Sequence, residues 1–182
     1  MISLSVLMDP GVVIVLMIRV LGPLLIFPYP LLGSILSEFV FDASDVIIWD
    51  AFCSLKHIDY TMWDKALDMW QLTIMVIVVL GWHHRKARKI GLWLFFIRLV
   101  GFVLYETTRI RVLFFIFPNL FSSYFITYLI CVKLGKKHWF NSPKLAILIL
   151  LVLLILKMPQ EYILHYLEVP TWDVIKGFLH PS

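Results

Sequence analysis

The chain has 182 residues, of which 61% are hydrophobic and 15% are charged, with a formal net charge of +4 and a mean hydropathy of +0.90. This composition excludes a soluble globular domain and indicates an all-α, polytopic transmembrane helix bundle. A nucleic-acid partner is not expected, because the basic residues fall in two short loops without interleaved aromatic residues. At about 20 residues per span, we expect about five spans in a single integral membrane domain, residues 1–182.

The first predicted span, residues 11–41, is interrupted by helix-breaking residues. These are Gly22, Pro23, Pro28 and Pro30. An unbroken helix over this range would be about 46 Å long at about 1.5 Å per residue, longer than a hydrocarbon core of about 30 Å. We therefore expect either one kinked, tilted helix or a span followed by a re-entrant half-helix. A break at membrane depth must be covered by protein or water, which places Glu38 and Asp42 near a cavity.

Acidic residues are concentrated after this span. Six of the twelve acidic residues lie here, namely Asp42, Asp45, Asp50, Asp59, Asp64 and Asp68. Carboxylates are costly to place beside hydrocarbon unless they are paired, bound to a metal or protonated. We therefore predict an outward-facing acidic pocket, in which Asp68 and Glu38 contact a cation or an amphiphilic ligand.

Asp64 and Asp68 lie at the start of the second predicted span, residues 66–82. Their i, i+4 spacing places both carboxylates on one face of a helix, where they have the chemistry to hold a divalent cation. Aspartate also caps helix N-termini and complements the helix dipole. Both interpretations stay open, and a divalent cation is the one cofactor that the sequence suggests.

Arg98 lies at the centre of the third predicted span, residues 90–106. An arginine at mid-span costs at least about 2.5–3.5 kcal/mol unless it snorkels or is paired. We therefore expect Arg98, and likewise Arg19, to face the interior of the bundle. The residues that share the helix face of Arg98 are Gly101, Tyr105 and Thr108.

The fourth predicted span, residues 112–132, carries a polar stripe. Asn119, Ser123 and Thr127 recur at i, i+4 and i+8, which predicts that they too face inward, and a kink is expected at Pro118. The two inward faces predict a polar seam inside the bundle.

The predicted seam has two interpretations. It is either a set of structural hydrogen bonds, in which Arg98 pairs with Asp68 or Glu38, or the lining of a pocket or permeation path. In the second case Arg98 is a counter-charge or an anion contact, and Asn119 is a ligand contact. Glu106 and Arg109, at i, i+3, are most simply a surface salt bridge, although Glu106 is also a candidate site residue.

The fifth predicted span covers residues 144–166, where Pro143 can open the helix and Pro159 is expected to kink or end it. The loops after the second and fourth spans carry four Lys and Arg residues each, and the other two loops carry two each. The positive-inside rule therefore places residues 83–89 and 133–144 in the cytoplasm and the acidic stretch, residues 42–64, outside the cell membrane.

One known family has a similar layout. An acidic pair opens the second span, the third span ends in GFVLYETTR, and the fourth is kinked at Pro118-Asn119. Over residues 42–137 this arrangement resembles the EXPERA membrane family, which includes the emopamil-binding sterol isomerase and the sigma-2 receptor. The resemblance implies that Asp68 and Glu106 meet a cationic amine or a developing carbocation. The family's catalytic histidine has no counterpart among these residues.

The leading functional hypothesis is the binding or transport of a cation or an amphiphilic ligand through the acidic pocket, with the lipid bilayer as solvent. A second hypothesis is a membrane-embedded enzyme that acts on lipid, prenyl or sterol substrates with Asp64 and Asp68. A third is an assembly or scaffold subunit of a membrane complex, whose charges pair with another subunit or with a second copy of the chain.

Overall fold

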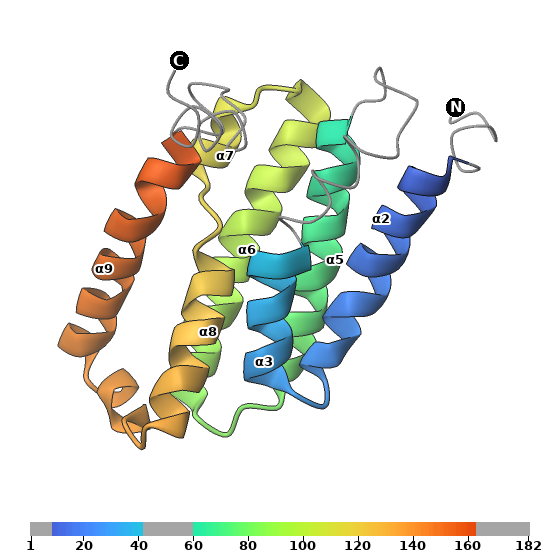
Figure 1. The fold of residues 1–182 in the computed structure, drawn as a ribbon. Coiled ribbons are helices and arrows are strands. Elements are labelled where there is room, and N and C mark those ends of the chain that lie inside the picture. The colour runs from blue at the N-terminus through green and yellow to red at the C-terminus, as the bar shows by residue number, and fades with distance from the viewer. Residues whose placement is uncertain (1–8, 42–59, 163–182) are drawn as a thin grey trace, which may run out of the picture. The chain divides into compact units, whose positions relative to one another are not determined.

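The structure is a computed structural model that describes residues 9–41 and 60–162, with the side chains of residues 60–63 left undescribed. Over these ranges the chain is helical and contains no strand, which confirms the all-α class (Figure 1). The predicted acidic residues Asp42, Asp45, Asp50 and Asp59 lie outside the described residues.

Three helical segments of the described chain are long and apolar enough to cross a membrane. They are Arg85–Thr108, Val112–Lys133 and Pro143–Glu161. A stretch of about 20 apolar residues matches the thickness of the hydrocarbon core, so these segments indicate a membrane protein. They correspond to the third, fourth and fifth spans that the sequence predicts.

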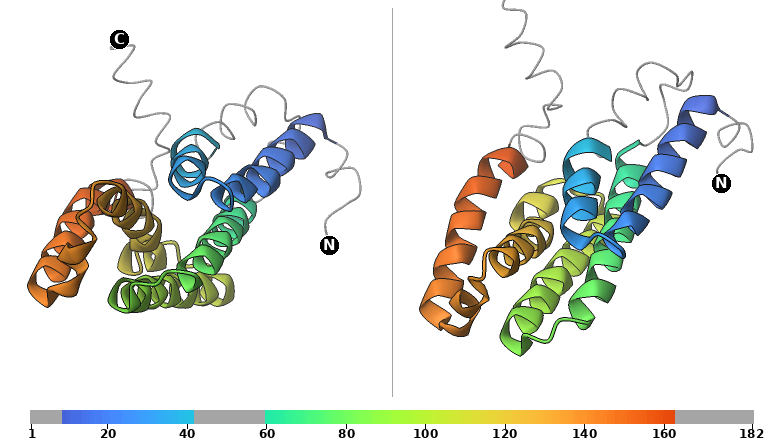
Figure 2. Two further views of the ribbon diagram at one scale, coloured as in Figure 1. Left: turned by 90° about the horizontal axis from the view of Figure 1, so that it is seen from below. Right: turned by 60° about the horizontal axis from the view of Figure 1, so that its bottom comes forward.

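The chain divides into two compact units, residues 1–81 and 82–182. The first unit contains two short helical segments, Pro10–Ile26 and Pro30–Phe41, followed by a longer helix, α5 (Tyr60–Leu80), which α2 contacts (Figure 2). The first segment consists of α2 (Pro10–Leu21) and η1 (Gly22–Ile26), and the second consists of α3 (Pro30–Ile35) and η2 (Leu36–Phe41). Here η1 is a 3₁₀-helix and η2 is a π-helix.

Proline and aspartate residues determine where the helical segments of the first unit begin and end. Asp9 caps α2, because its Oδ1 accepts a hydrogen bond from Gly11 N at 2.9 Å. Pro23 has no N–H to donate to the preceding turn, and the chain narrows there from α2 to η1. Pro30 then occupies the first turn of α3, where a missing N–H is tolerated.

Gly33 allows α3 to lie against η1. A Cβ at this position would lie 2.6 Å from Ile26 N and 2.7 Å from Leu25 O, both backbone atoms of the opposing segment. Backbone atoms held in a helical turn cannot rotate aside as a side chain would. The contact between the two halves of residues 10–41 therefore depends on glycine at this position.

We expect Gly33→Ala to lower the free energy of unfolding by about 1–3 kcal/mol, the usual cost of overpacking a close contact. The measurement is equilibrium unfolding of the purified protein in mixed micelles. Gly81→Ala is the matched control, because the one neighbour of its added Cβ is Val78 O at 3.4 Å. Equal losses in the two variants would contradict a special role for Gly33.

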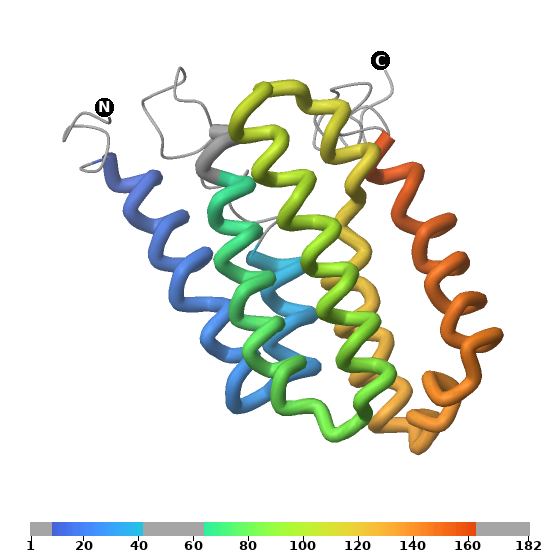
Figure 3. The backbone as a smooth tube through the Cα atoms, turned by 180° about the vertical axis from the view of Figure 1, so that it is seen from behind, coloured from blue at the N-terminus to red at the C-terminus, as the bar shows by residue number. Residues whose placement is uncertain are grey.

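The second unit begins with α6 (Arg85–Thr108) and ends with α9 (Pro143–Glu161). Between them lie α7 (Val112–Ile116), α8 (Leu120–Lys133) and the 3₁₀-helix η3 (Lys137–Asn141). Figure 3 follows this path from α6 (light green) through α7 and α8 (yellow to orange) to α9. α8 contacts both α6 and α9.

An aromatic cluster forms the core of this unit beside the start of α6. The Trp82 ring stacks on Tyr128 at a centroid distance of 3.9 Å, and Tyr128 also packs edge-on against Phe140. The Tyr124 hydroxyl donates a hydrogen bond to Ala87 O at 3.0 Å. These contacts tie α8 and η3 to the first turn of α6.

Candidate functional site

Four charged side chains form a network in the first unit. The Arg19 guanidinium of α2 donates to Asp64 Oδ1 at 3.2 Å and to Asp68 Oδ1 at 2.7 Å on α5. The Lys65 ammonium lies 2.8 Å from Asp64 Oδ2 and 3.1 Å from Asp68 Oδ2. Each carboxylate is therefore shared between the same two cations, and the four charges sum to zero.

The positions of these residues agree with two of the sequence predictions. Asp64 and Asp68 do lie on one face of α5, as their i, i+4 spacing predicts, and Arg19 is buried. A divalent cation there would have to displace Arg19 and Lys65 from all four carboxylate oxygens. Among the described residues, no group of three or more His, Cys, Asp or Glu side chains has the arrangement of a metal site. A metal at Asp64 and Asp68 stays an untested prediction.

Glu38, the other acidic residue expected in the first unit's pocket, lies in η2. Its Oε2 accepts a hydrogen bond from Gln71 Nε2 of α5 at 3.2 Å, and Gln71 is buried. The preceding residue on α5, Trp70, donates from Nε1 to Val20 O at 3.0 Å. Side chains of α5 thus satisfy polar groups on both halves of residues 10–41.

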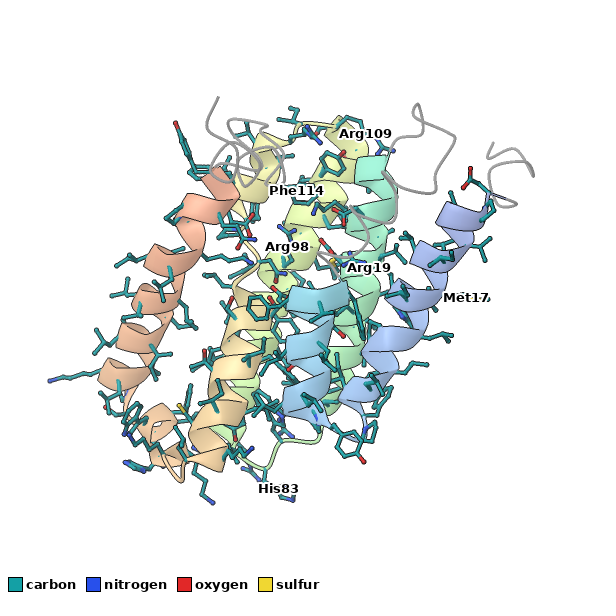
Figure 4. The ribbon with its side chains drawn as sticks, in the orientation of Figure 1. Met17, Arg19, His83, Arg98, Arg109 and Phe114 are labelled. Atoms are coloured by element: carbon teal, nitrogen blue, oxygen red, sulfur yellow. The ribbon has the colours of Figure 1, made fainter. Side chains whose placement is uncertain are left out.

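In the second unit, Arg98 of α6 meets a break in the following helical segment (Figure 4). The segment loses helical geometry at residues 117–119, between α7 and α8. Because of this break, the helix supplies no donor for the Phe117 carbonyl. Arg98 donates a hydrogen bond to that carbonyl at 3.0 Å. The guanidinium also lies 4.6 Å from the centroid of the Phe114 ring. Arg98 is buried, as expected for a mid-span arginine.

The same break exposes a backbone donor, which a second charged side chain satisfies. Asn119 N donates to Glu161 Oε1 of α9 at 3.2 Å, and Glu161 is 4% exposed. Asn119 also caps α8, with its Oδ1 3.5 Å from Ser122 N. A backbone break at membrane depth requires such partners, because lipid offers none.

The predicted inward face of α6 is only partly as expected. Arg98, Gly101 and Tyr105 are all buried, and a Cβ on Gly101 would lie 2.5 Å from Phe117 Cβ, so glycine permits this approach. Thr108 is exposed, and its hydroxyl bonds to Leu104 O at 2.7 Å.

The predicted polar stripe of α8 differs more from the structure. Ser123 and Thr127 are only half-buried, and the buried face of α8 is mainly aromatic. Its buried residues are Phe121, Ser122, Tyr124, Phe125, Tyr128 and Cys131. Large rings exclude more apolar surface from solvent than small hydroxyls do, which explains why they occupy the inner side.

The end of α6 brings together the remaining candidate residues. Glu106 Oε2 lies 3.0 Å from the Arg109 guanidinium, the salt bridge that the spacing predicts. Glu106 Oε1 is buried and has no hydrogen-bond partner among the described residues. The Arg109 guanidinium also lies 5.8 Å from the centroid of the Tyr105 ring.

Arg109 adopts an unusual backbone conformation at this position. Its φ is 59° and its ψ is 19°, in the left-handed region, and its N–H donates to Tyr105 O at 2.7 Å. Glycine is the residue that ends helices this way without strain, and another residue there costs about 1–2 kcal/mol. Such strained positions cluster at functional sites, so the end of α6 is the candidate site.

Comparison with known proteins assigns the chain to no family. No family model, curated protein or solved structure matches the chain. The resemblance to the EXPERA family therefore stays a prediction. The pairing of Arg98 with Asp68 or Glu38 also stays a prediction, because these residues belong to different units.

Two of the residues that complete these sites are not predicted from the sequence, namely Glu161 and Lys65. A signal for Glu161 exists in the sequence, because it is an acidic residue two positions after Pro159, at the end of the apolar run of α9. No signal identifies the residue that it contacts.

Proposed function

We propose that the chain is an integral membrane protein that binds an amphiphilic molecule through a cationic head group, and that Glu106 accepts that group. One observation carries the proposal, namely that Glu106 Oε1 is buried without a donor among the described residues. A buried carboxylate oxygen left unpaired costs at least about 1–3 kcal/mol. A ligand donor at Oε1 would remove this cost.

The other acidic candidates support the choice of Glu106. Asp64 and Asp68 each have both carboxylate oxygens beside Arg19 or Lys65. Glu38 accepts from Gln71. Binding a ligand cation at any of these three would first require breaking an existing contact, whereas Glu106 offers an oxygen that is already desolvated.

The surroundings of Glu106 favour an amphiphile over a free ion. The residue lies in the last turn of α6, which is long and apolar enough to span a membrane. Its side chain is 27% exposed, and the neighbouring Val103 and Leu104 are exposed apolar residues. An amphiphile whose head group binds the carboxylate can therefore keep its tail in hydrocarbon.

Our proposal includes a bundle of five spans with a broken first span, in the cell membrane. The basic loops, residues 83–89 and 133–144, would then lie in the cytoplasm by the positive-inside rule, and Glu106 would lie near the opposite surface. The resemblance to the EXPERA family favours the same ligand class, since it implies an acidic contact to a cationic amine at Glu106.

Dodecylamine is a suitable probe, because it carries an ammonium head on a simple alkyl chain. We expect saturable binding to the purified protein in nanodiscs, measured by calorimetry, and a higher melting temperature. A hydrogen bond to a charged group is worth about 1.5–3 kcal/mol, so Glu106→Gln should weaken binding by about 10- to 150-fold.

Two controls make this experiment specific. Dodecanol has the same chain without the charge, and Glu38→Gln removes a carboxylate that already has a protein partner. Dodecanol should bind more weakly than dodecylamine, and Glu38→Gln should bind dodecylamine as the original protein does. The proposal is wrong if dodecanol binds as tightly as dodecylamine, or if Glu106→Gln binds the amine as the original protein does.

A further inference from the structure

An open apolar groove of about 400 Å³ lies on the first half of α6, away from Glu106. It is lined by Lys89, Leu92, Trp93 and Phe96. Their spacing of i, i+3, i+4 and i+7 places all four on one face of the helix. The groove therefore runs along the helix axis from a cation into an apolar region.

Two aromatic side chains give the groove its shape. The rings of Trp93 and Phe96 meet edge to face at a centroid distance of 6.0 Å and an angle of 89°. They are 66% and 52% exposed, so they face the surroundings of the protein instead of its core. Around a membrane-spanning helix, those surroundings are lipid chains.

The end of the groove carries positive charge that the described residues do not neutralise. Lys89 is exposed and has no hydrogen bond or ion pair within the described part of the chain, and the same holds for Arg85 one turn earlier. Lys86 differs, because it donates to Asn141 O at 2.8 Å. Arg85 and Lys89, at i, i+4, lie on the helix face that continues into the groove.

We propose that this groove binds an anionic phospholipid, with its phosphate at Arg85 and Lys89 and an acyl chain between Trp93 and Phe96. Basic residues at a membrane surface attract anionic head groups, and a chain in the groove would hold that lipid in one place. From Lys89 to Phe96 the groove spans about 10 Å at about 1.5 Å per residue, enough for the upper part of one chain. Charge and shape together favour this occupant.

Native mass spectrometry of the full chain, released from a neutral detergent with added lipid, tests the proposal. We expect one palmitoyl-oleoyl phosphatidylglycerol to be retained at concentrations where phosphatidylcholine with the same chains is lost. Lys89→Gln should weaken retention about fivefold, the value of one cation near a charged membrane surface, and Arg85→Gln/Lys89→Gln about 25-fold. Phe96→Ala should also weaken it severalfold, since it removes one wall of the groove.

Matched variants separate a site from general charge attraction. Lys137→Gln removes the same charge from η3, and Ile155→Ala removes an exposed apolar side chain from α9. Both should retain phosphatidylglycerol as the original protein does. The proposal is overturned if Lys137→Gln weakens retention as much as Lys89→Gln, if phosphatidylcholine is retained equally well, or if inorganic phosphate at millimolar concentration displaces the lipid. Dodecylamine binding at Glu106 does not depend on any of these results.

Discussion

Arg19→Met is expected to lower the free energy of unfolding by about 3–5 kcal/mol, the usual loss when one partner of a buried ion pair is removed. Arg19 is 2% exposed and contacts both Asp64 and Asp68. Without it, the four-residue network changes from neutral to a net charge of −1, and both carboxylates lose the contact to the buried guanidinium. Equilibrium unfolding in mixed micelles measures the loss.

A charge-balanced double variant distinguishes the network from simple packing. Arg19→Met/Asp68→Leu leaves the Lys65–Asp64 pair, which is neutral and 2.8 Å apart. Its stability should lie closer to that of the original protein than the stability of Arg19→Met does, because groups in one ion-pair network are strongly coupled. Lys137→Met, at an exposed position, should change stability by no more than about 0.5 kcal/mol. Additive losses in the double variant would rule out the coupling.

Local spacing accounts for the part of these sites that the sequence predicts. The shared face of Asp64 and Asp68, the Glu106–Arg109 pair and the break at Pro118 all depend on residues no more than four positions apart or on a single proline. Helical periodicity and proline chemistry are sufficient for such features.

Long-range partners are the part that spacing cannot supply. Arg19 and Asp68 are separated by 49 positions, and Asn119 and Glu161 by 42. The sequence predicts that a mid-span arginine needs a partner, but several carboxylates are compatible with that requirement. Which one it meets depends on how the helices pack, and apolar residues decide that packing.

The position of Trp82 also depends on packing that sequence spacing does not predict. Tryptophan at the end of a span is typical of the interfacial belt, yet Trp82 is 8% exposed and stacks on Tyr128. The preference of a single residue for the interface is weaker than the gain from stacking several rings together. Burial of this face by rings is also why Ser123 and Thr127 are not the inner stripe of α8.

Arg98→Met is expected to lower the free energy of unfolding by about 3–5 kcal/mol, from two losses. The Phe117 carbonyl at the break loses its hydrogen bond of 3.0 Å, at a cost of about 1–3 kcal/mol for an unsatisfied buried group. The desolvated contact with the Phe114 ring, at 4.6 Å, contributes about 2 kcal/mol more. The apolar methionine is better solvated by lipid, but it offers the carbonyl no donor.

Graded variants at the same break test this account. Arg98→Lys keeps the charge but lacks the planar group that lies over Phe114, so it should recover only part of the loss. Glu161→Gln keeps an oxygen that can accept from Asn119 N, so it should cost about 1 kcal/mol, whereas Glu161→Leu leaves that N–H unpaired and should cost about 1–3 kcal/mol. If Arg98→Met and Arg98→Lys were equally stable, charge and hydrogen bonding at the break would not be what holds α7 and α8 together. If Glu161→Gln and Glu161→Leu lost the same stability, the contact to Asn119 would be incidental.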